Sequence, residues 1–337
     1  MHLVSLGQQE FGQIRSVLSC NAENERSLLS KHSDIIVITH DSCVKHETGF
    51  GHPERPERLT AILDMLKADL PDIPVLQSPA ASDQQILAAH SRLYLDEVKA
   101  ASPRAGLVHL DPDTAISPGS LLAAYHGAGA AIMAVDKVMG DEASAAFCAI
   151  RPPGHHAETD AAMGFCIFGN AYIAARHAQD RHGVRNVAIV DFDVHHGNGT
   201  ADMIYQHARP DIFYASTHQF PLYPGTGDPR VEDDAGGLIV NVPLPAGTGS
   251  DDFRAAYTDI IFPAVKAFKP ELLIISAGFD AHRDDPIGGM RLSEADFGWV
   301  TAGLKALAPK VISVLEGGYD LPALAGSVRA HLEALRD

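Results

Sequence analysis

Residues 187–199 read Val-Ala-Ile-Val-Asp-Phe-Asp-Val-His-His-Gly-Asn-Gly. The first four residues are apolar and mostly β-branched, which is typical of a strand buried on both faces of a parallel sheet. In an extended chain, Asp191, Asp193 and His195 project from one face. Two carboxylates and an imidazole on one face suit a divalent metal ion. The spacing alone also fits an ordinary polar loop, but the preceding strand and the following glycines favour a metal site.

Short apolar runs and amphipathic stretches alternate along most of the chain, which favours an α/β fold. Further strands are predicted at Ile35–Thr39, Ala145–Ile150, Ile212–Ala215, Leu238–Val242, Leu272–Ser276 and Val311–Leu315. Helices are predicted at Leu121–Val138, Ala171–Ala178, Asp251–Phe268, Ser293–Leu307 and Ala323–Leu335, and another from Pro56. We expect one domain, residues 34–337, with a mostly parallel central sheet and helices on both faces. Residues 1–33 form a predicted N-terminal arm that packs on the domain or on a partner subunit in a homo-oligomer.

The composition limits which binding partners and which cellular compartment we expect for this protein. The 337 residues carry a formal charge of −17, which repels nucleic acid and attracts cations, although an acidic surface also simply favours solubility. No run approaches the ~18 apolar residues of a membrane helix, and residues 1–16 lack the features of a signal peptide. The four cysteines include no C-x-x-C pair, so free thiols and a cytoplasmic location are predicted.

Polar clusters also follow three other predicted strands, at Arg151–His156, Ala277–Asp280 and Glu316–Tyr319. The carboxyl ends of parallel strands meet at one edge of a sheet, where ligands bind. Asp280 is the natural third ligand beside an aspartate and a histidine. Such a set leaves a position open for water and favours zinc, although Fe(II) and Co(II) also fit.

The remaining side chains at these strand ends suit proton transfer and charge stabilisation. Of the adjacent His155 and His156, one can take a proton from an attacking water while the other supplies electrostatics. The hydroxyl of Tyr319 can donate to a developing oxyanion. Each residue alone also has an ordinary packing explanation. Their recurrence at four strand ends makes that explanation improbable for the whole set.

These motifs resemble those of the histone deacetylase and acetylpolyamine amidohydrolase family. The matching segments, in the family's order, are 52–58, 151–157, 164–166, 191–200, 223–227, 277–280 and 316–319. The resemblance implies the arginase/deacetylase fold, with one zinc ion held by Asp193, His195 and Asp280. It also implies a structural potassium ion at Asp191, Asp193, His195 and Ser216.

By matched position, His156 resembles the family's general base and acid, and His155 its electrostatic partner with Asp191 behind it. Tyr319 resembles the residue that polarises the carbonyl. The same comparison places Gly164, Phe165 and Tyr223 at the acyl-lysine tunnel and Arg58 near an internal acetate channel. Asn198 stands where class I deacetylases carry aspartate, a feature of the class II and bacterial branch.

Two positions bear on the substrate. Ile116 falls near the place of the acidic rim residue of class I enzymes, so that residue is expected to be missing. Asp111 and Asp113 lie just upstream, and either of them, or Asp284 or Asp285, could still line the rim and bind a cation. Ile287 occupies a place where polyamine-selective relatives carry an acidic gatekeeper. We therefore expect a zinc deacylase acting on acyl-lysine in peptides or proteins. A deacetylase of acylpolyamines or other small acylated amines, a dinuclear manganese ureohydrolase and a non-catalytic acyl-lysine binder are the alternatives.

Overall fold

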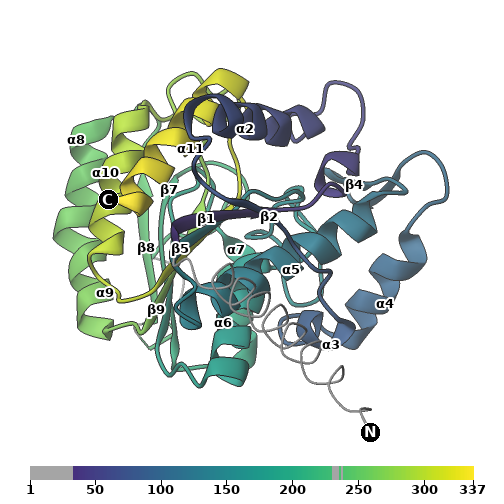
Figure 1. The fold of residues 1–337 in the computed structure, drawn as a ribbon, viewed down its shortest axis with the longest axis horizontal. Coiled ribbons are helices and arrows are strands. Elements are labelled where there is room, and N and C mark those ends of the chain that lie inside the picture. Colours follow the sequence, from purple (N-terminus) through teal and green to yellow (C-terminus); the bar gives the residue numbers. More distant parts are fainter. Residues whose placement is uncertain (1–32, 230–234, 237) are drawn as a thin grey trace, which may run out of the picture.

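β6 (Val187–Asp191), the strand of the opening motif, lies inside an eight-stranded sheet of order β2-β1-β5-β10-β9-β6-β7-β8 (Figure 1). This computed structural model describes residues 33–229, 235–236 and 238–337. Every strand pair of this sheet is parallel. The other strands are β1 (Ser33–Thr39), β2 (Val75–Gln77), β5 (Ala143–Cys148), β7 (Ile212–Gln219), β8 (Ile239–Leu244), β9 (Leu272–Ala277) and β10 (Val311–Leu315).

Helices cover both faces of the sheet, as predicted (Figure 1). One layer contains α5 (Ser120–Met139) and α6 (Asn170–His182), and the other contains α2 (Pro56–Asp69), α10 (Glu294–Lys305) and α11 (Leu321–Arg336). Each residue of β6, β9 and β10 is buried. The sequence of these strands is mostly apolar because neither face meets water. The predicted single α/β domain is therefore confirmed.

Several elements were not predicted. They are strand β2, the short helices η1 (Cys43–Lys45), α3 (Asp83–Ile86), α4 (Arg92–Ala101) and α7 (Asn198–His207), and a separate antiparallel hairpin of β3 (Val108–Asp111) and β4 (Thr114–Ile116). The helix predicted at 251–268 is divided into α8 (Ser250–Ala256), a π-helical turn η2 (Tyr257–Ile261) and α9 (Phe262–Phe268). Pro263, in the first turn of α9, has no N–H to donate, so the regular α-helical hydrogen bonding cannot continue through it.

The predicted arm, residues 1–33, lies outside the described residues except for Ser33, which begins β1. Within the described part of the chain, no helix combines the length and the apolar character needed to cross a bilayer.

The sheet order brings the four polar clusters together. β5, β10, β9 and β6 are consecutive neighbours, and these are the four strands predicted to end in polar clusters. Their parallel direction places all four carboxyl ends at one edge. The segments that follow them therefore meet, although they come from four distant parts of the chain.

Candidate active site

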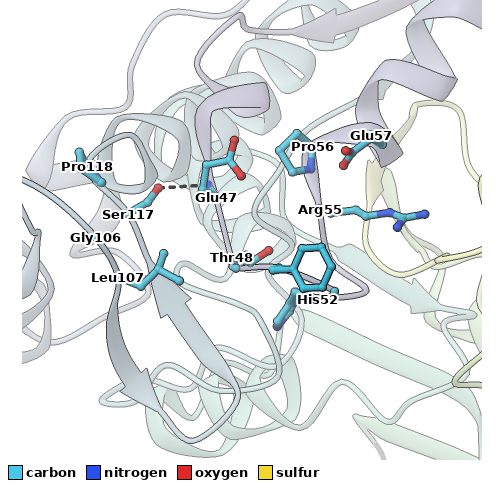
Figure 2. A pocket seen from close by; sticks show the side chains of 13 residues that line it. Glu47, Thr48, His52, Arg55, Pro56, Glu57, Gly106, Leu107, Ser117 and Pro118 are labelled. Atoms are coloured by element: carbon cyan, nitrogen blue, oxygen red, sulfur yellow. Dashed lines mark hydrogen bonds between the residues drawn. The ribbon is translucent and has the colours of Figure 1, made fainter.

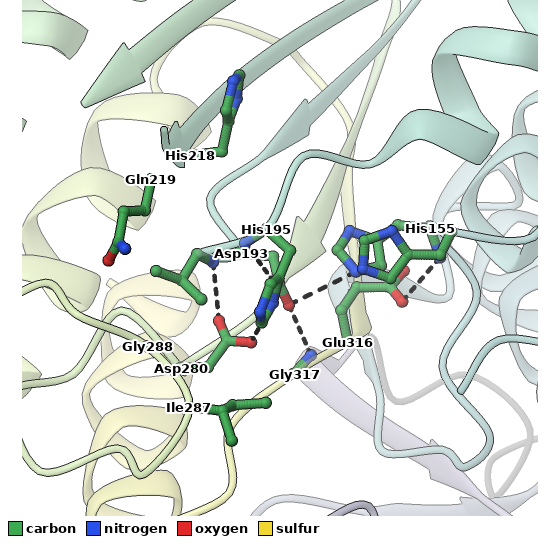
Figure 3. A network of polar contacts seen from close by, with 12 residues as sticks. His155, Asp193, His195, His218, Gln219, Asp280, Ile287, Gly288, Glu316 and Gly317 are labelled. Atoms are coloured by element: carbon green, nitrogen blue, oxygen red, sulfur yellow. Dashed lines mark hydrogen bonds and ion pairs between the residues drawn. The ribbon is translucent and has the colours of Figure 1, made fainter. Parts of the chain in front are cut away.

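Asp193, His195 and Asp280 converge at this edge of the sheet (Figure 3). Nδ1 of His195 lies 3.0 Å from Oδ1 of Asp193 and 3.2 Å from Oδ2 of Asp280. Donor atoms of the three residues lie within 4.8 Å of one another, and all three residues are buried. The arrangement expected from the sequence is therefore present.

Backbone groups hold the two carboxylates in place. Oδ2 of Asp193 accepts a hydrogen bond from the Gly317 N–H at 2.8 Å, and Oδ1 of Asp280 accepts one from Val194 N–H at 2.8 Å. Glycine is needed at 317 because a Cβ there would stand 2.1 Å from the Asp280 carboxylate. The Glu-Gly-Gly-Tyr motif therefore gives the chain room to pass beside the acidic cluster.

The charge balance of the cluster fits a divalent cation. Burial raises the pKa of Asp280, and the nearby Asp193 carboxylate adds to this, so that it reaches about 7. Burial lowers the pKa of His195, but its hydrogen bonds to Asp193 and Asp280 outweigh this and raise it to about 10. Two buried carboxylates thus require positive charge between them, which a metal ion provides in place of protons.

The adjacent histidines have different partners. Nδ1 of His155 lies 3.0 Å from Oδ2 of Asp191. Nδ1 of His156 lies 2.7 Å from Oδ1 of Asn198. Burial lowers the pKa of His155, but the Asp193 and Asp191 carboxylates outweigh this and raise it to about 10. Burial, followed by the positive charge of His155, lowers the pKa of His156 well below its ordinary value. One histidine therefore favours the charged form and the other the neutral form.

Two glutamates for which the sequence predicts no role support these histidines. Oε2 of Glu316 accepts hydrogen bonds from the backbone N–H groups of Gly154 and His155, at 2.7 and 3.1 Å. Oε1 of Glu158 accepts one from Nδ2 of Asn198 at 2.7 Å. Glu316 belongs to a noted motif and Glu158 follows the His-His pair by two residues. Their contacts, however, depend on segments distant in sequence.

The Tyr319 ring packs against Arg58, which belongs to a buried cluster with Arg151 and Glu54. The Arg58 guanidinium lies 4.8 Å from the centre of the Tyr319 ring, and Nε of Arg58 donates to the Gly318 carbonyl at 2.6 Å. Arg58 and Arg151 both contact Glu54, at 3.1 and 2.7 Å. Burial raises the pKa of Glu54, but Arg151 and the other neighbours outweigh this and lower it to about 2. Arg58 and Arg151 therefore share the Glu54 carboxylate, and Arg58 packs against the tyrosine from one side.

A cavity of about 270 Å³ leads to these groups. Its walls include Gly164, Phe165, Leu222 and Tyr223, and His156, His195 and Tyr319 also line it. Gly164 has a φ of +57°, and a Cβ there would lie 2.3 Å from the His156 ring. Glycine therefore permits the wall to approach the histidine closely. The predicted tunnel residues are brought together, whereas Arg58 does not line this cavity.

The rim of the cavity carries an acidic residue, contrary to the prediction. Ile116 is buried in β4 and does not reach the cavity, while Asp113, in the turn before β4, lines it. Oδ1 of Asp113 accepts a hydrogen bond from the Gly164 N–H at 3.0 Å. The prediction that an acidic rim residue is missing was wrong, because the hairpin turn carries Asp113 to the rim. Ile287 lines the cavity as an uncharged residue.

Residues 52–335 match the histone deacetylase domain family. The chain belongs to the histone deacetylase family. The match includes each of the four clusters described above. The predicted arginase/deacetylase fold and the predicted enzyme class, a deacetylase, are therefore confirmed.

Relatives of this deacetylase come from distant organisms. The chain is 41% identical over 282 residues to the histone deacetylase-like amidohydrolase of Pseudomonas aeruginosa, covering 80% of this chain and 73% of that protein. It is 37% identical over 297 residues to a probable deacetylase of Archaeoglobus fulgidus, covering 85% and 81%. The crystal structure of the HDA15 HD domain matches with a TM-score of 0.85 at 34% identity, covering 90% of this chain and 88% of that one.

A wider groove of about 680 Å³ lies on the deacetylase beside the cavity (Figure 2). The 47–57 loop forms one side, and Leu107 and Ser117 lie on the other. His52 lines the groove and packs edge-to-face on Phe165, with ring centres 4.7 Å apart. The groove and the cavity therefore share a wall.

Proposed function

We propose that this deacetylase is zinc-dependent and removes acetyl or related acyl groups from lysine side chains in peptides or proteins. The cavity is the single observation that carries the proposal. Two aromatic side chains, Phe165 and Tyr223, line it together with the metal-ligand candidate His195. The aliphatic stem of an acyl-lysine suits such walls. Its amide would then lie beside the polar groups.

Asp193, His195 and Asp280 would hold one Zn²⁺ per chain, since their donor atoms converge and their charge calls for a cation. Zinc would act as a Lewis acid on the substrate carbonyl and make the attacking water more acidic. Tyr319 would donate a hydrogen bond to the same carbonyl oxygen. Its place at the cavity, held from behind by Arg58, supports this role.

His156 would take the proton from the water and return it to the leaving amine. Its Nδ1 faces the acceptor oxygen of Asn198, so Nδ1 carries the proton and Nε2 keeps a lone pair for the base. His155, paired with Asp191, would supply positive charge beside it. This division follows from the different partners of the two rings.

Tyr319→Phe is expected to lower kcat by roughly 100-fold, about 3 kcal/mol, because one oxyanion donor is lost while the ring remains. KM for an acetyl-lysine peptide should change much less, because the hydrogen bond strengthens in the transition state. Steady-state kinetics on zinc-loaded protein measures both constants. An unchanged kcat on an unactivated substrate would exclude this role for Tyr319.

The groove favours a peptide over a free amine. A residue attached to acyl-lysine outside the cavity can lie along the shared wall near His52, close to the exposed Leu107 (Figure 2). Phe50 is exposed in the same groove. A small acylated amine has no group to place there. Position 287 carries an isoleucine and no carboxylate that could bind a second ammonium group, which also favours a peptide substrate.

We expect a higher kcat/KM for acetyl-lysine peptides than for acetylspermidine or acetylputrescine on one zinc-loaded preparation. The identity of the residues that flank the acetyl-lysine should change kcat/KM only modestly, because the cavity contains the reacting group. A preference of about tenfold for either polyamine, roughly 1.4 kcal/mol, would contradict the peptide assignment.

Acylpolyamine deacetylation is the second candidate, and Asp113 favours it. A carboxylate at the cavity wall can attract an ammonium group beyond the scissile amide. Asp113→Asn keeps the acceptor for the Gly164 N–H and removes the charge. For a polyamine enzyme, this substitution would lower kcat/KM for acetylspermidine much more than for acetyl-lysine peptides.

Two further features belong to this proposal. A structural K⁺ would bind near Asp191, Asp193, His195 and Ser216. Asp191 and Ser216 are directly opposite each other across β6 and β7.

A cytoplasmic location is supported by Cys43, Cys148 and Cys166, which are free and buried. A homo-oligomer involving the N-terminal arm stays a prediction.

A further inference from the structure

Asp136, His177 and His182 bring metal-binding atoms together outside the active site. Asp136 lies in α5, and the two histidines lie in α6. Both Nε2 atoms lie 2.7 Å from the same oxygen, Oδ1 of Asp136. Donor atoms of the three residues lie within 4.8 Å of one another. We propose that these residues form a second metal site, which takes a divalent transition metal ion such as Zn²⁺ or Cu²⁺.

The donor set suits such an ion. Two imidazole nitrogens and one carboxylate oxygen are ligands that zinc and copper prefer. Metal–ligand bonds of ~2.0–2.2 Å separate neighbouring donors by roughly 3 to 3.5 Å. The present separations of 2.7 Å therefore need to widen only slightly. The side chains of His177, His182 and Asp136 are 13%, 23% and 49% exposed, which leaves room for water to complete the coordination.

The two helices preorganise the donors. α5 and α6 lie side by side in one layer (Figure 1), and Asp136 is the only link that the structure gives for either Nε2 atom among the described residues. The donor atoms of both helices therefore already face one another.

The position of the cluster indicates a role other than deacetylation. α6 runs from the segment after β5 back to the start of β6. Its last residue, His182, therefore lies toward the edge of the sheet opposite the active site. An ion there would connect α5 and α6. Two metal ions in this chain would then not imply a dinuclear centre.

Titration calorimetry with Zn²⁺ on enzyme already loaded at the active site tests this proposal. We expect one further ion per chain, which is lost in the His177→Ala/His182→Ala variant, while deacetylase activity is retained and reports an intact fold. His109→Ala, at an exposed histidine of β3, is the matched control and should keep the ion. Titrated Cu²⁺ should show imidazole nitrogen coupling in its EPR spectrum only when His177 and His182 are present. A single ion in the parent enzyme, or a second ion retained in the double variant, would overturn the site.

A second inference comes from Glu158, a residue outside the roles proposed above, and it rests on the proposed function. Nδ2 of Asn198 donates to Oε1 of Glu158 at 2.7 Å, and Oδ1 of Asn198 lies 2.7 Å from Nδ1 of His156. A carboxylate only accepts hydrogen bonds, so it selects the NH₂ end of the amide. The geometry points to Glu158 as the positioning residue that sets the tautomer of His156 through Asn198.

This role follows from the ambiguity of an amide. Asn198 can turn either end toward His156, whereas an aspartate offers only acceptors. The reversed amide would donate to Nδ1, so the proton would move to Nε2 and the base would be lost. The Met163 sulfur, 3.1 Å from Nδ2, is a weaker acceptor. Glu158 and Asn198 both line an open cavity of about 340 Å³, so a different side chain at 158 can be accommodated.

Glu158→Lys reverses the preference, because an ammonium only donates. We expect a fall in kcat of about tenfold or more for Glu158→Lys, a smaller fall for Glu158→Ala and the smallest for Glu158→Gln, all with unchanged zinc content. Glu97→Lys, on the exposed face of α4, controls for the charge change.

Imidazole ¹⁵N shifts of His156 in the zinc-loaded enzyme provide a readout that a structural role would not change. They should show an Nδ1 proton in the parent and in Glu158→Gln, and an Nε2 proton in Glu158→Lys. An unchanged tautomer in Glu158→Lys would refute the role of Glu158 alone. A parent enzyme that hydrolyses none of the acylated substrates would instead refute the proposed function.

Discussion

Asp280→Asn is expected to weaken zinc binding by more than ~100-fold and to abolish deacetylation at the same metal concentration. Loss of an outer partner of a ligand already costs 10–100-fold in affinity, and this substitution removes a ligand charge directly. Asparagine keeps the oxygen that accepts from the Val194 N–H. It replaces only the oxygen that faces His195, so the local fold should be retained.

Elemental analysis after dialysis, together with kinetics across a zinc series, measures this effect. The parent enzyme should keep about one tightly held zinc per chain, and Asp280→Asn should keep almost none. His195→Ala should behave in the same way. Two manganese ions per active chain that are both kept in His177→Ala/His182→Ala and both lost in Asp280→Asn would instead favour the ureohydrolase interpretation and contradict the zinc site.

His156→Ala is expected to lower kcat by ~10²–10⁴-fold while the zinc content stays near that of the parent. General acid–base catalysis contributes a factor of this size, and His156 lies at the cavity with Nε2 free to accept a proton. The ring is not part of the Asp193, His195 and Asp280 cluster. Metal binding should therefore survive its removal.

His155→Ala is the informative comparison for this prediction. It removes the partner of Asp191 but leaves the base, so we expect a smaller loss of kcat. His109→Ala controls for the removal of a histidine from the surface. Near-normal turnover in His156→Ala would show that another group accepts the proton.

The metal cluster and the fold class could be predicted from the sequence because the patterns that indicate them are local. An apolar strand such as Val311–Leu315 was predicted with the bounds of β10 because both its faces are buried. Asp193 and His195 share one short motif, and strand period alone places them on one face. Local chemistry was therefore enough to indicate a metal site at a strand end.

The roles of other site residues could not be predicted, because they depend on contacts between segments that are distant in the chain. Glu158 contacts Asn198 across 40 residues, and Glu316 holds the Gly154 N–H across 162. The hairpin that brings Asp113 to the rim also buries Ile116. Glu158 has no local pattern that distinguishes it from a solvated surface residue, and the motif that contains Glu316 does not show which backbone groups its carboxylate contacts.

An α/β deacetylase with polar clusters after four buried strands could be predicted from the sequence alone. The neighbouring positions of β5, β10, β9 and β6, the residue at the rim and the contact of Glu158 with Asn198 became known only from the folded chain. The physical reason is that strand burial and motif chemistry act over a few neighbouring residues. Sheet order and hydrogen-bond partners depend instead on the packing of segments that lie far apart in the chain.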